Sequence, residues 1–271
     1  MLHPMSVRMT VLASGSRGNC ALVATTRTRV LVDAGISCRE TFKRLKQAGE
    51  DPRMLSAIVI THEHSDHVYG LATLARKLKI PLFVNGATYA AWRRSLKDSG
   101  QETPGSGYRE SFDSGRRFVV GDIEIFPFTI PHDAADPVGF TLRGEGVKVA
   151  FATDLGYLPR NVCEHLRGCD VIVIESNHDV EMLRIGPYPW SVKQRVMSRV
   201  GHLSNETLAQ FFTNEYDGSA SFLVLAHLSE QNNHPELARR AAEKALGPRQ
   251  TLLNNRILLA GQSEPLQAIR L

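Results

Sequence analysis

The segment from Ile58 to His67 constrains the fold of this chain more than any other stretch. Its first residues, Ile58-Val59-Ile60, are typical of a buried strand. Five ionisable side chains then follow within six residues, in the order His62-Glu63-His64-Ser65-Asp66-His67. Such a group at the end of a buried strand is costly to desolvate unless something binds it. Imidazoles and carboxylates are ligands of zinc and related transition metals, so the segment predicts a metal site.

The spacing within this cluster indicates two ions. His62 and His64 lie two residues apart, which places both side chains on one side of an extended loop. Asp66 and His67 are adjacent and can turn toward a second ion as a helix begins. One short cluster cannot close two sites, so we expect isolated histidines or aspartates at the ends of other strands.

Three residues meet this expectation: His132, Asp154 and His227. Each stands where an apolar strand meets a loop, the position at which binding groups gather in layered α/β proteins. With the cluster, they make seven candidate ligands for two ions.

Strand-like and helix-like stretches alternate along the chain, in two similar halves that are each rich in strands and then helices. Strand patterns occur at Val7–Ala13, Ala21–Ala24, Arg29–Val32, Ser56–Thr61, Pro81–Val84, Phe118–Val120, Ile123–Phe128, Gly139–Leu142, Val147–Ala152, Val171–Glu175, Ser221–Ala226 and Ile257–Ala260. Helical patterns occur at Ser37–Gln47, Val68–Lys79, Tyr89–Lys97, Pro159–Leu166, Ser191–Arg199, Asn205–Asn214 and Pro235–Leu246. Two packed sheets with helices outside suit this order, so we expect an α/β fold in one domain, residues 1–271.

Composition narrows the class of protein. The 271 residues are 42% hydrophobic and 22% charged, as in an ordinary globular protein, and no apolar run is long enough to span a bilayer. The first residues lack the apolar stretch of a secretory signal, and the four cysteines include no CxxC pair. We therefore expect a cytoplasmic protein with reduced thiols and no membrane partner. The formal charge of +4 permits a polyanionic partner without requiring one.

The order HxHxDH, lone His, lone Asp, lone His resembles the metallo-β-lactamase superfamily, and the match runs from about Met9 to Leu246. The resemblance implies a four-layer αββα fold, with two mixed β-sheets sandwiched between helices. It implies that the first ion is bound by His62, His64 and His132, and the second by Asp66, His67 and His227. Asp154 would bridge both ions. Asp33 would support the HxHxDH loop through hydrogen bonds, the alternative being a turn or cap aspartate before Gly35.

A finer resemblance is to the WalJ/YycJ-like branch of this superfamily. It rests on Ser14-Gly15-Ser16-x-Gly18-Asn19, Glu175-Ser176-Asn177-His178, Gly201-His202-Leu203-Ser204-Asn205 and His227-Leu228-Ser229-x-x-Asn232-Asn233. The branch implies a 5′-to-3′ DNA exonuclease. The stretch between Asp154 and His227 is too short for the insertion of the β-CASP nucleases. No cysteine replaces a ligand in the cluster, which makes antibiotic hydrolysis less favoured.

The expected reaction is phosphodiester hydrolysis. Two neighbouring cations lower the pKa of a bridging water, so that hydroxide is available as the nucleophile near neutral pH. Asp66 and Asp154 would then be catalytic as well as ligating. His178, His202 and His227 are candidates to protonate or contact the leaving oxygen. The alternative for His202 is an ordinary residue before a helix cap. Glu175 is either part of this site or a simple strand-end carboxylate.

Six small polar residues are expected to contact the substrate: Ser14, Ser16, Asn19, Asn177, Ser204 and Asn205. The helix start after His202 offers free amides for a phosphate. Basic stretches around Arg93, Arg109 and Arg116, and near Lys193, can follow a DNA backbone, although such runs are usually solvated faces. Four aromatic residues can stack on bases or simply pack, namely Trp92, Tyr108, Tyr188 and Trp190.

The leading function is thus a hydrolase that uses two divalent ions and acts on DNA ends. The ions are expected to be zinc, with manganese or iron as alternatives. A small-molecule hydrolase on the same site, such as a cyclic phosphodiesterase, thioesterase or lactonase, is the runner-up. A metal-binding module without catalysis is the third reading. Strand preference, polarity, oligomeric state and pathway stay open.

Overall fold

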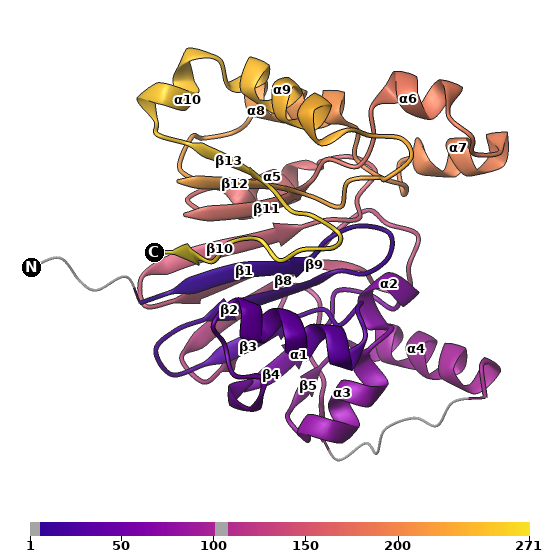
Figure 1. Cartoon of the computed structure of the whole chain (residues 1–271), viewed down its shortest axis with the longest axis vertical. Coiled ribbons are helices and arrows are strands. Elements are labelled where there is room, and N and C mark those ends of the chain that lie inside the picture. Colours follow the sequence, from indigo (N-terminus) through magenta and orange to yellow (C-terminus); the bar gives the residue numbers. More distant parts are fainter. Residues whose placement is uncertain (1–5, 101–107) are drawn as a thin grey trace, which may run out of the picture.

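Two seven-stranded sheets pack face to face in the computed structural model, which describes residues 6–100 and 108–271 (Figure 1). In spatial order the first sheet contains β14 (Ile269–Arg270), β1 (Arg8–Ala13), β2 (Cys20–Ala24), β3 (Arg29–Val32), β4 (Ala57–Val59), β5 (Leu82–Phe83) and β6 (Arg109–Glu110). The second contains β13 (Arg256–Leu259), β12 (Phe222–Ala226), β11 (Val171–Glu175), β10 (Val147–Ala152), β9 (Val138–Gly144), β8 (Ile123–Thr129) and β7 (Phe118–Val120).

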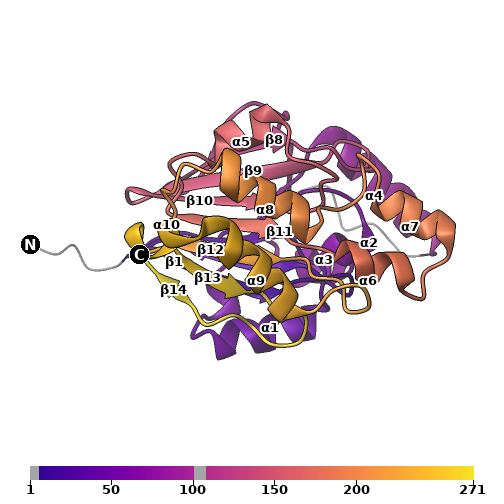
Figure 2. The ribbon, with the colours of Figure 1, turned by 90° about the horizontal axis from the view of Figure 1, so that it is seen from above.

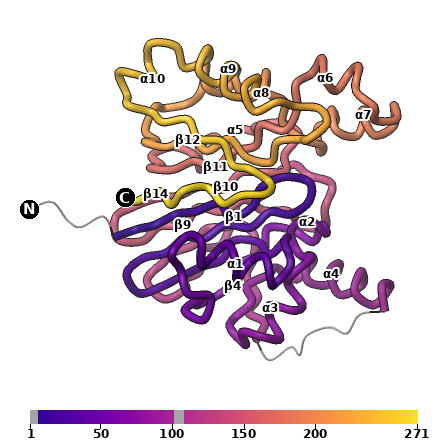
Figure 3. The backbone as a smooth tube through the Cα atoms, in the orientation of Figure 1, coloured from indigo at the N-terminus to yellow at the C-terminus, as the bar shows by residue number. Residues whose placement is uncertain are grey.

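Both sheets are mixed. From β3 to β6 the strands run parallel, and so do the strands from β10 to β13. The remaining neighbours are antiparallel, including β14, which returns to lie beside β1 (Figure 3). The carboxyl ends of the parallel strands are where the sequence places most of the candidate ligands.

The central strands are apolar at almost every position because both of their faces are covered. In β4, Ala57 and Val59 face the core between the sheets, whereas Ile58 packs toward the helices outside. In β11 the residues alternate in the same way, with Val173 facing inward and Ile172 facing outward. The alternation gives three stacked apolar layers, one between the sheets and one beneath each layer of helices.

Helices cover the outer face of each sheet (Figures 1 and 2). Those on the first sheet are α1 (Cys38–Gln47), α3 (Leu71–Leu78) and α4 (Gly86–Asp98). Those on the second are α5 (Arg160–Leu166), α8 (Asn205–Asn214) and α9 (Pro235–Leu246). The shorter segments are η1 (Pro52–Met54), α2 (Ser65–Val68), α6 (Val180–Ile185), α7 (Trp190–Val196) and α10 (Pro248–Leu252). The predicted α/β fold of four layers is therefore confirmed.

One predicted helix was wrong in its extent. The pattern over Val68–Lys79 indicated a single helix, but the chain forms α2 and α3 with a break at Gly70. The backbone at Gly70 lies so close to the Ile36 carbonyl that a Cβ would stand 2.1 Å from its oxygen, and the Gly70 amide donates to Ala34. This packing turns the chain there. The structure also has α6, β6, β14 and α10, which the sequence patterns did not indicate.

Within the described residues no helix is both long and apolar enough to cross a membrane. The prediction of one domain for residues 1–271 stays a prediction, and residues 1–5 and 101–107 lie outside the described part.

Glu50 links the first strands to the loop after α1. Its carboxylate accepts hydrogen bonds from Arg8 Nε at 2.7 Å and Arg29 Nε at 2.9 Å, and its side chain is 7% exposed. Burial raises the pKa of Glu50, but the two guanidinium groups lower it more, so the net shift is downward. A carboxyl group with a lowered folded-state pKa stabilises the protein above its unfolded-state pKa and loses that contribution as the pH falls.

We expect Glu50→Gln to lower the free energy of unfolding at pH 7 by about 1.5–3 kcal/mol, the range for hydrogen bonds to charged groups. The difference should shrink as the pH falls below about 4.3, the ordinary glutamate value, because Glu50 then takes up a proton in the unfolded chain, and in the folded protein only at a lower pH. Urea unfolding between pH 7 and pH 3.5 measures this. Glu124→Gln, in an exposed pair with Arg117, is the control and should change little. An equal loss in both variants at all pH values would contradict the assignment.

Candidate metal centre

Three strands are each followed by a residue with a strained backbone and an ionisable side chain, and these three residues lie in or beside the candidate ligand groups. Asp33, Asp154 and His227 follow β3, β10 and β12, and all three have a left-handed backbone, with φ between 55° and 62°. Residues other than glycine rarely adopt this conformation, and it persists only where the surroundings impose it. At His227 the Ser14 hydroxyl accepts from the backbone amide at 2.7 Å, and Asn177 donates to the carbonyl at 2.8 Å.

The Asp33 carboxylate anchors the HxHxDH loop through contacts with Thr61 and His67. Its carboxylate accepts from the Thr61 amide at 2.9 Å and lies 2.8 Å from His67 Nδ1. The neighbouring Gly35 lies against the same loop, since a Cβ there would stand 1.6 Å from the Asp66 carbonyl oxygen. No larger residue fits, so the loop carrying the four ligands is fixed by direct backbone contact. These are the contacts that the supporting role expected of Asp33 requires.

His62, His64 and His132 form the first ligand group, and one nitrogen from each lies within 4.8 Å of the others. The opposite nitrogens are held by the protein. His62 Nδ1 is 3.0 Å from Thr61 Oγ1, and His64 Nε2 is 3.2 Å from the Asp133 carbonyl. His132 Nδ1 is 3.1 Å from the Val200 carbonyl. Contacts of this kind fix the ring orientation of metal-binding histidines.

Asp66, His67, Asp154 and His227 form the second group. Asp66 Oδ2 lies 3.5 Å from His67 Nε2 and 3.4 Å from His227 Nε2, and Asp154 Oδ2 lies 3.2 Å from His67 Nε2. Burial lowers the pKa of His67, but the Asp154, Asp33 and Asp66 carboxylates raise it more, so the net shift is upward. The same carboxylates favour a cation here. Asp154 belongs by distance to this group, and its bridging to the first ion stays a prediction.

Buried polar atoms without a hydrogen-bond partner indicate whether these two groups suit metal ions. Among the described residues, His62 Nε2 and Asp154 Oδ2 are buried and lack a hydrogen bond. The 3.2 Å contact between Asp154 Oδ2 and His67 Nε2 lacks hydrogen-bond geometry, as expected of two ligands that face one cation. Buried polar atoms are rarely left unpaired, so their presence within both groups fits two bound ions. Imidazoles and carboxylates also match the ligand chemistry of zinc, manganese or iron.

Glu175 connects the second group to His202, which the sequence patterns alone did not reveal. The fully buried carboxylate lies 2.8 Å from both His202 Nδ1 and His227 Nδ1, and it accepts from the Leu155 and Leu203 amides. Burial raises the pKa of Glu175. The charge of His202 and the hydrogen bonds from His202 and His227 lower this pKa more, to about 2. With Asp154, these residues form a third cluster of possible ligands, but the hydrogen bonds already occupy Glu175. Its place at the end of an apolar strand was the available signal.

His202 and His178 both line a cleft of about 240 Å³ that also contains His64, Asp66, Asp154 and His227. Burial lowers the pKa of His202, but Glu175 raises it more, so the net shift is upward. Burial lowers the pKa of His178 to about 4, and its buried Nδ1 has no partner among the described residues. His202 therefore favours the charged form and His178 the neutral form.

The six expected substrate contacts separate into two sets. Ser16 and Asn177 line the cleft. The other four are buried and hold other parts of the chain: Ser14, Asn19, Ser204 and Asn205. Asn19 Nδ2 donates to Asp66 Oδ2 at 3.1 Å, and Ser204 Oγ accepts from Thr207 at the start of α8. Their place outside the lining of the cleft favours support of the centre, and their contact with substrate stays a prediction.

The α8 terminus offers fewer free amides than expected. The Asn205 amide donates to the His178 carbonyl and the Thr207 amide to Ser204. A phosphate site at this terminus is therefore less favoured than the sequence indicated.

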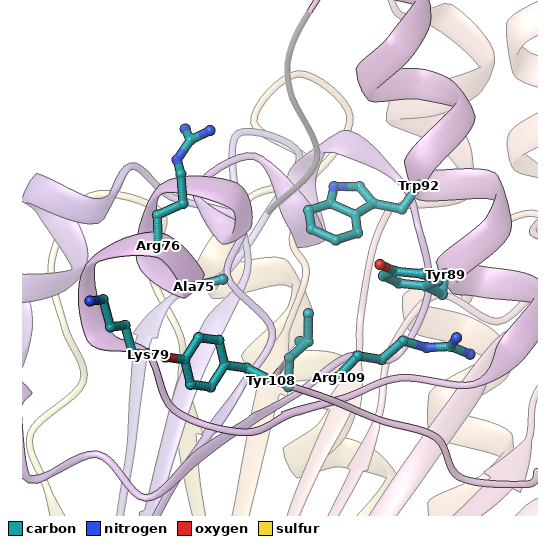
Figure 4. Close-up of a pocket in the computed structure, with 8 residues that line it drawn as sticks. Ala75, Arg76, Lys79, Tyr89, Trp92, Tyr108 and Arg109 are labelled. Carbon is teal, nitrogen blue, oxygen red and sulfur yellow. The ribbon is translucent and has the colours of Figure 1, made fainter. Parts of the chain in front are cut away.

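Most of the aromatic and basic residues singled out in the sequence lie away from the cleft. Trp92 and Tyr108 line a separate pocket of about 200 Å³ with Tyr89 and Arg109 (Figure 4). The Arg109 guanidinium lies 4.2 Å from the centre of the Tyr89 ring. Only Tyr188, of the four aromatics, lines the cleft itself. Arg195 also lines it, but its Nε lies 2.6 Å from Asp133.

Comparison with known proteins assigns the family. A family model described as a beta-lactamase superfamily domain matches residues 28–227. The exodeoxyribonuclease YycJ of Bacillus anthracis is 40% identical over 242 residues, which are 89% of this chain and 90% of the relative. The exodeoxyribonuclease WalJ of Streptococcus pneumoniae is 38% identical over 237 residues, 88% of this chain and 87% of the relative.

Solved structures agree on the fold. The metallo-β-lactamase fold protein YhfI from Bacillus subtilis superposes with a TM-score of 0.68 at 15% identity, over 96% of this chain and 99% of its own. A diphosphatase from the PhnP family superposes with a TM-score of 0.67 at 18% identity, over 99% of both chains. The family match and the long alignments with close relatives lead to one conclusion. The chain belongs to the metallo-β-lactamase superfamily of hydrolases, in the branch that includes the YycJ and WalJ exodeoxyribonucleases.

Proposed function

We propose that this protein is a DNA exonuclease that uses two metal ions and degrades strands from the 5′ end. One observation carries the substrate class: relatives named exodeoxyribonucleases align at 38–40% identity over nearly the whole chain. The geometry supports the reaction class, because members of both ligand groups line one cleft together with His202, which Glu175 holds. Location in the cytoplasm and the identity of the metals are parts of the same proposal.

The proposal assigns a metal-binding role to each residue of the two ligand groups. His62, His64 and His132 would hold one ion, and the second group would hold the other, with Asp154 between them. The ions, when bound, lower the pKa of a water and offset negative charge on phosphate oxygens.

Glu175 holds His202 by its Nδ1 and leaves Nε2 for the substrate. A charged imidazole in that position donates a proton to the leaving oxygen. Glu175 also holds His227 by its Nδ1, so one carboxylate aligns a ligand and a proton donor.

A matched set of substrates tests the proposal. The protein, loaded in turn with zinc and manganese, is incubated with 5′-labelled DNA, a generic phosphodiester, a thioester and a lactone. Short labelled products from the first time points are expected with DNA, with a rate that falls steeply as salt is added. Turnover of the thioester or lactone with intact DNA would instead assign a small-molecule hydrolase.

A further inference from the structure

We define the α6–α7 surface by Ile185, Tyr188, Trp190, Val192 and Met197, and two of these side chains form part of one wall of the cleft. The surface lies between Glu175 and His202 in the chain, and α6 and α7 stand at the edge of the molecule away from β14 (Figures 1 and 2). Tyr188 and Val192 line the cleft beside the candidate ligands. Substrate bound at the metal centre therefore lies next to this wall.

Exposed apolar side chains concentrate on this segment. Among the described residues twelve large hydrophobic side chains are exposed, and five of them lie between residues 185 and 200. Ile185 is 73% exposed and Trp190 62%, whereas the other tryptophan, Trp92, is 2% exposed. Exposed apolar area beside a binding cleft usually marks a contact with a partner or ligand.

The positive charges of the segment are already engaged by the protein. Arg184 pairs with Glu181 at 2.8 Å, and Lys193 Nζ donates to the Arg184 carbonyl at 2.8 Å. Arg195 pairs with Asp133, and Arg199 lies over the Tyr157 ring. The segment thus offers aromatic and apolar area more than free charge for a phosphate backbone.

We propose that the α6–α7 surface stacks unpaired bases of the substrate strand, with Trp190 as its main contact. The inference rests on the proposed function and adds to it that the strand is held by its bases as well as by its phosphates. Aromatic side chains bind single strands in this way without sequence preference, because every base has a flat face. Bases paired inside a duplex cannot reach such a surface, so the strand must be unpaired where it crosses α7.

The test compares strands with and without bases. The metal-loaded protein is titrated with a phosphorothioate oligothymidylate, which resists hydrolysis, and with the same backbone carrying abasic residues. We expect Trp190→Ala to weaken binding of the thymine strand roughly tenfold and to leave the abasic strand within about twofold. Trp190→Phe should restore most of the loss. Leu252→Ala is the matched control, because Leu252 is 82% exposed on α10, outside the α6–α7 surface.

Fluorescence gives a second readout. The Trp92→Phe variant leaves Trp190 as its only tryptophan, because the chain contains two. Its emission should be quenched by the thymine strand and much less by the abasic strand.

Three results would overturn the inference. If Trp190→Ala weakens both strands equally, or neither, while DNA is still cleaved, the surface does not stack bases and the proposed function stands. If the wild-type protein neither binds nor cleaves DNA, both proposals fail together. If sedimentation shows a dimer that Trp190→Ala dissociates, the surface belongs to a second copy of the chain.

Discussion

Replacing Asp154 by alanine is expected to remove both metal ions and abolish hydrolysis. The side chain is 2% exposed, and its Oδ2 faces His67 without a hydrogen bond. If Asp154 binds both ions as proposed, its loss removes several kcal/mol of charge stabilisation in the transition state, which corresponds to a rate loss on the order of a thousandfold or more. Elemental analysis and rates on labelled DNA measure the two effects.

Asp170→Ala is the matched control for this variant. Asp170 precedes β11 at the opposite end of the strand from Glu175, where its carboxylate accepts from the Lys148 amide. It should keep the full metal content and rate. If Asp154→Ala retains one ion per chain, Asp154 belongs to the second group alone. If both metal content and rate are unchanged, the ligand assignment fails.

His202→Ala is expected to keep its metal ions and its fold, with a melting temperature lowered by the loss of the partner of Glu175. Its rate should fall on the order of one hundredfold or more, the usual scale for general acid catalysis. His202 contacts Glu175 at 2.8 Å and lines the cleft, but it belongs to neither of the two ligand groups assigned to the ions. Metal content, melting temperature and single-turnover rates on DNA give the three readouts.

Two further variants help to interpret the His202→Ala result. His234→Ala removes an exposed histidine outside the cleft and should leave the rate unchanged. Glu175→Gln should lose both rate and metal affinity, each by about 10–100-fold, because Glu175 aligns His202 and His227 together. Metal loss in His202→Ala would make His202 a ligand, and a normal rate would make it a residue before a helix cap.

The seven candidate ligands lie in two neighbouring groups, and the sequence indicated this because several of them stand at the end of an apolar strand. His62, Asp154 and His227 follow runs such as Ile58-Val59-Ile60, and parallel strands bring their carboxyl ends to one edge. The layered arrangement of sheets and helices was also predictable, because strands that are apolar on both faces must be covered on both sides.

Features that depend on contacts between distant segments were not predictable. The break at Gly70 arises from the approach of the Ile36 carbonyl, which a helical periodicity cannot reveal. Glu175 looked like any strand-end carboxylate until His202 and His227 were placed on either side of it. The burial of Asn19 was not predictable either, because burial cannot be read from a polar turn.

The most direct test of a nuclease with two ions is a titration of metal-free protein with zinc or manganese, following hydrolysis of a 5′-labelled strand. The ligand groups predict that the rate rises until two ions are bound per chain and then levels off. The labelled product should be short throughout. A rate that levels off at one ion per chain, or DNA cleavage by the metal-free protein, would contradict the account.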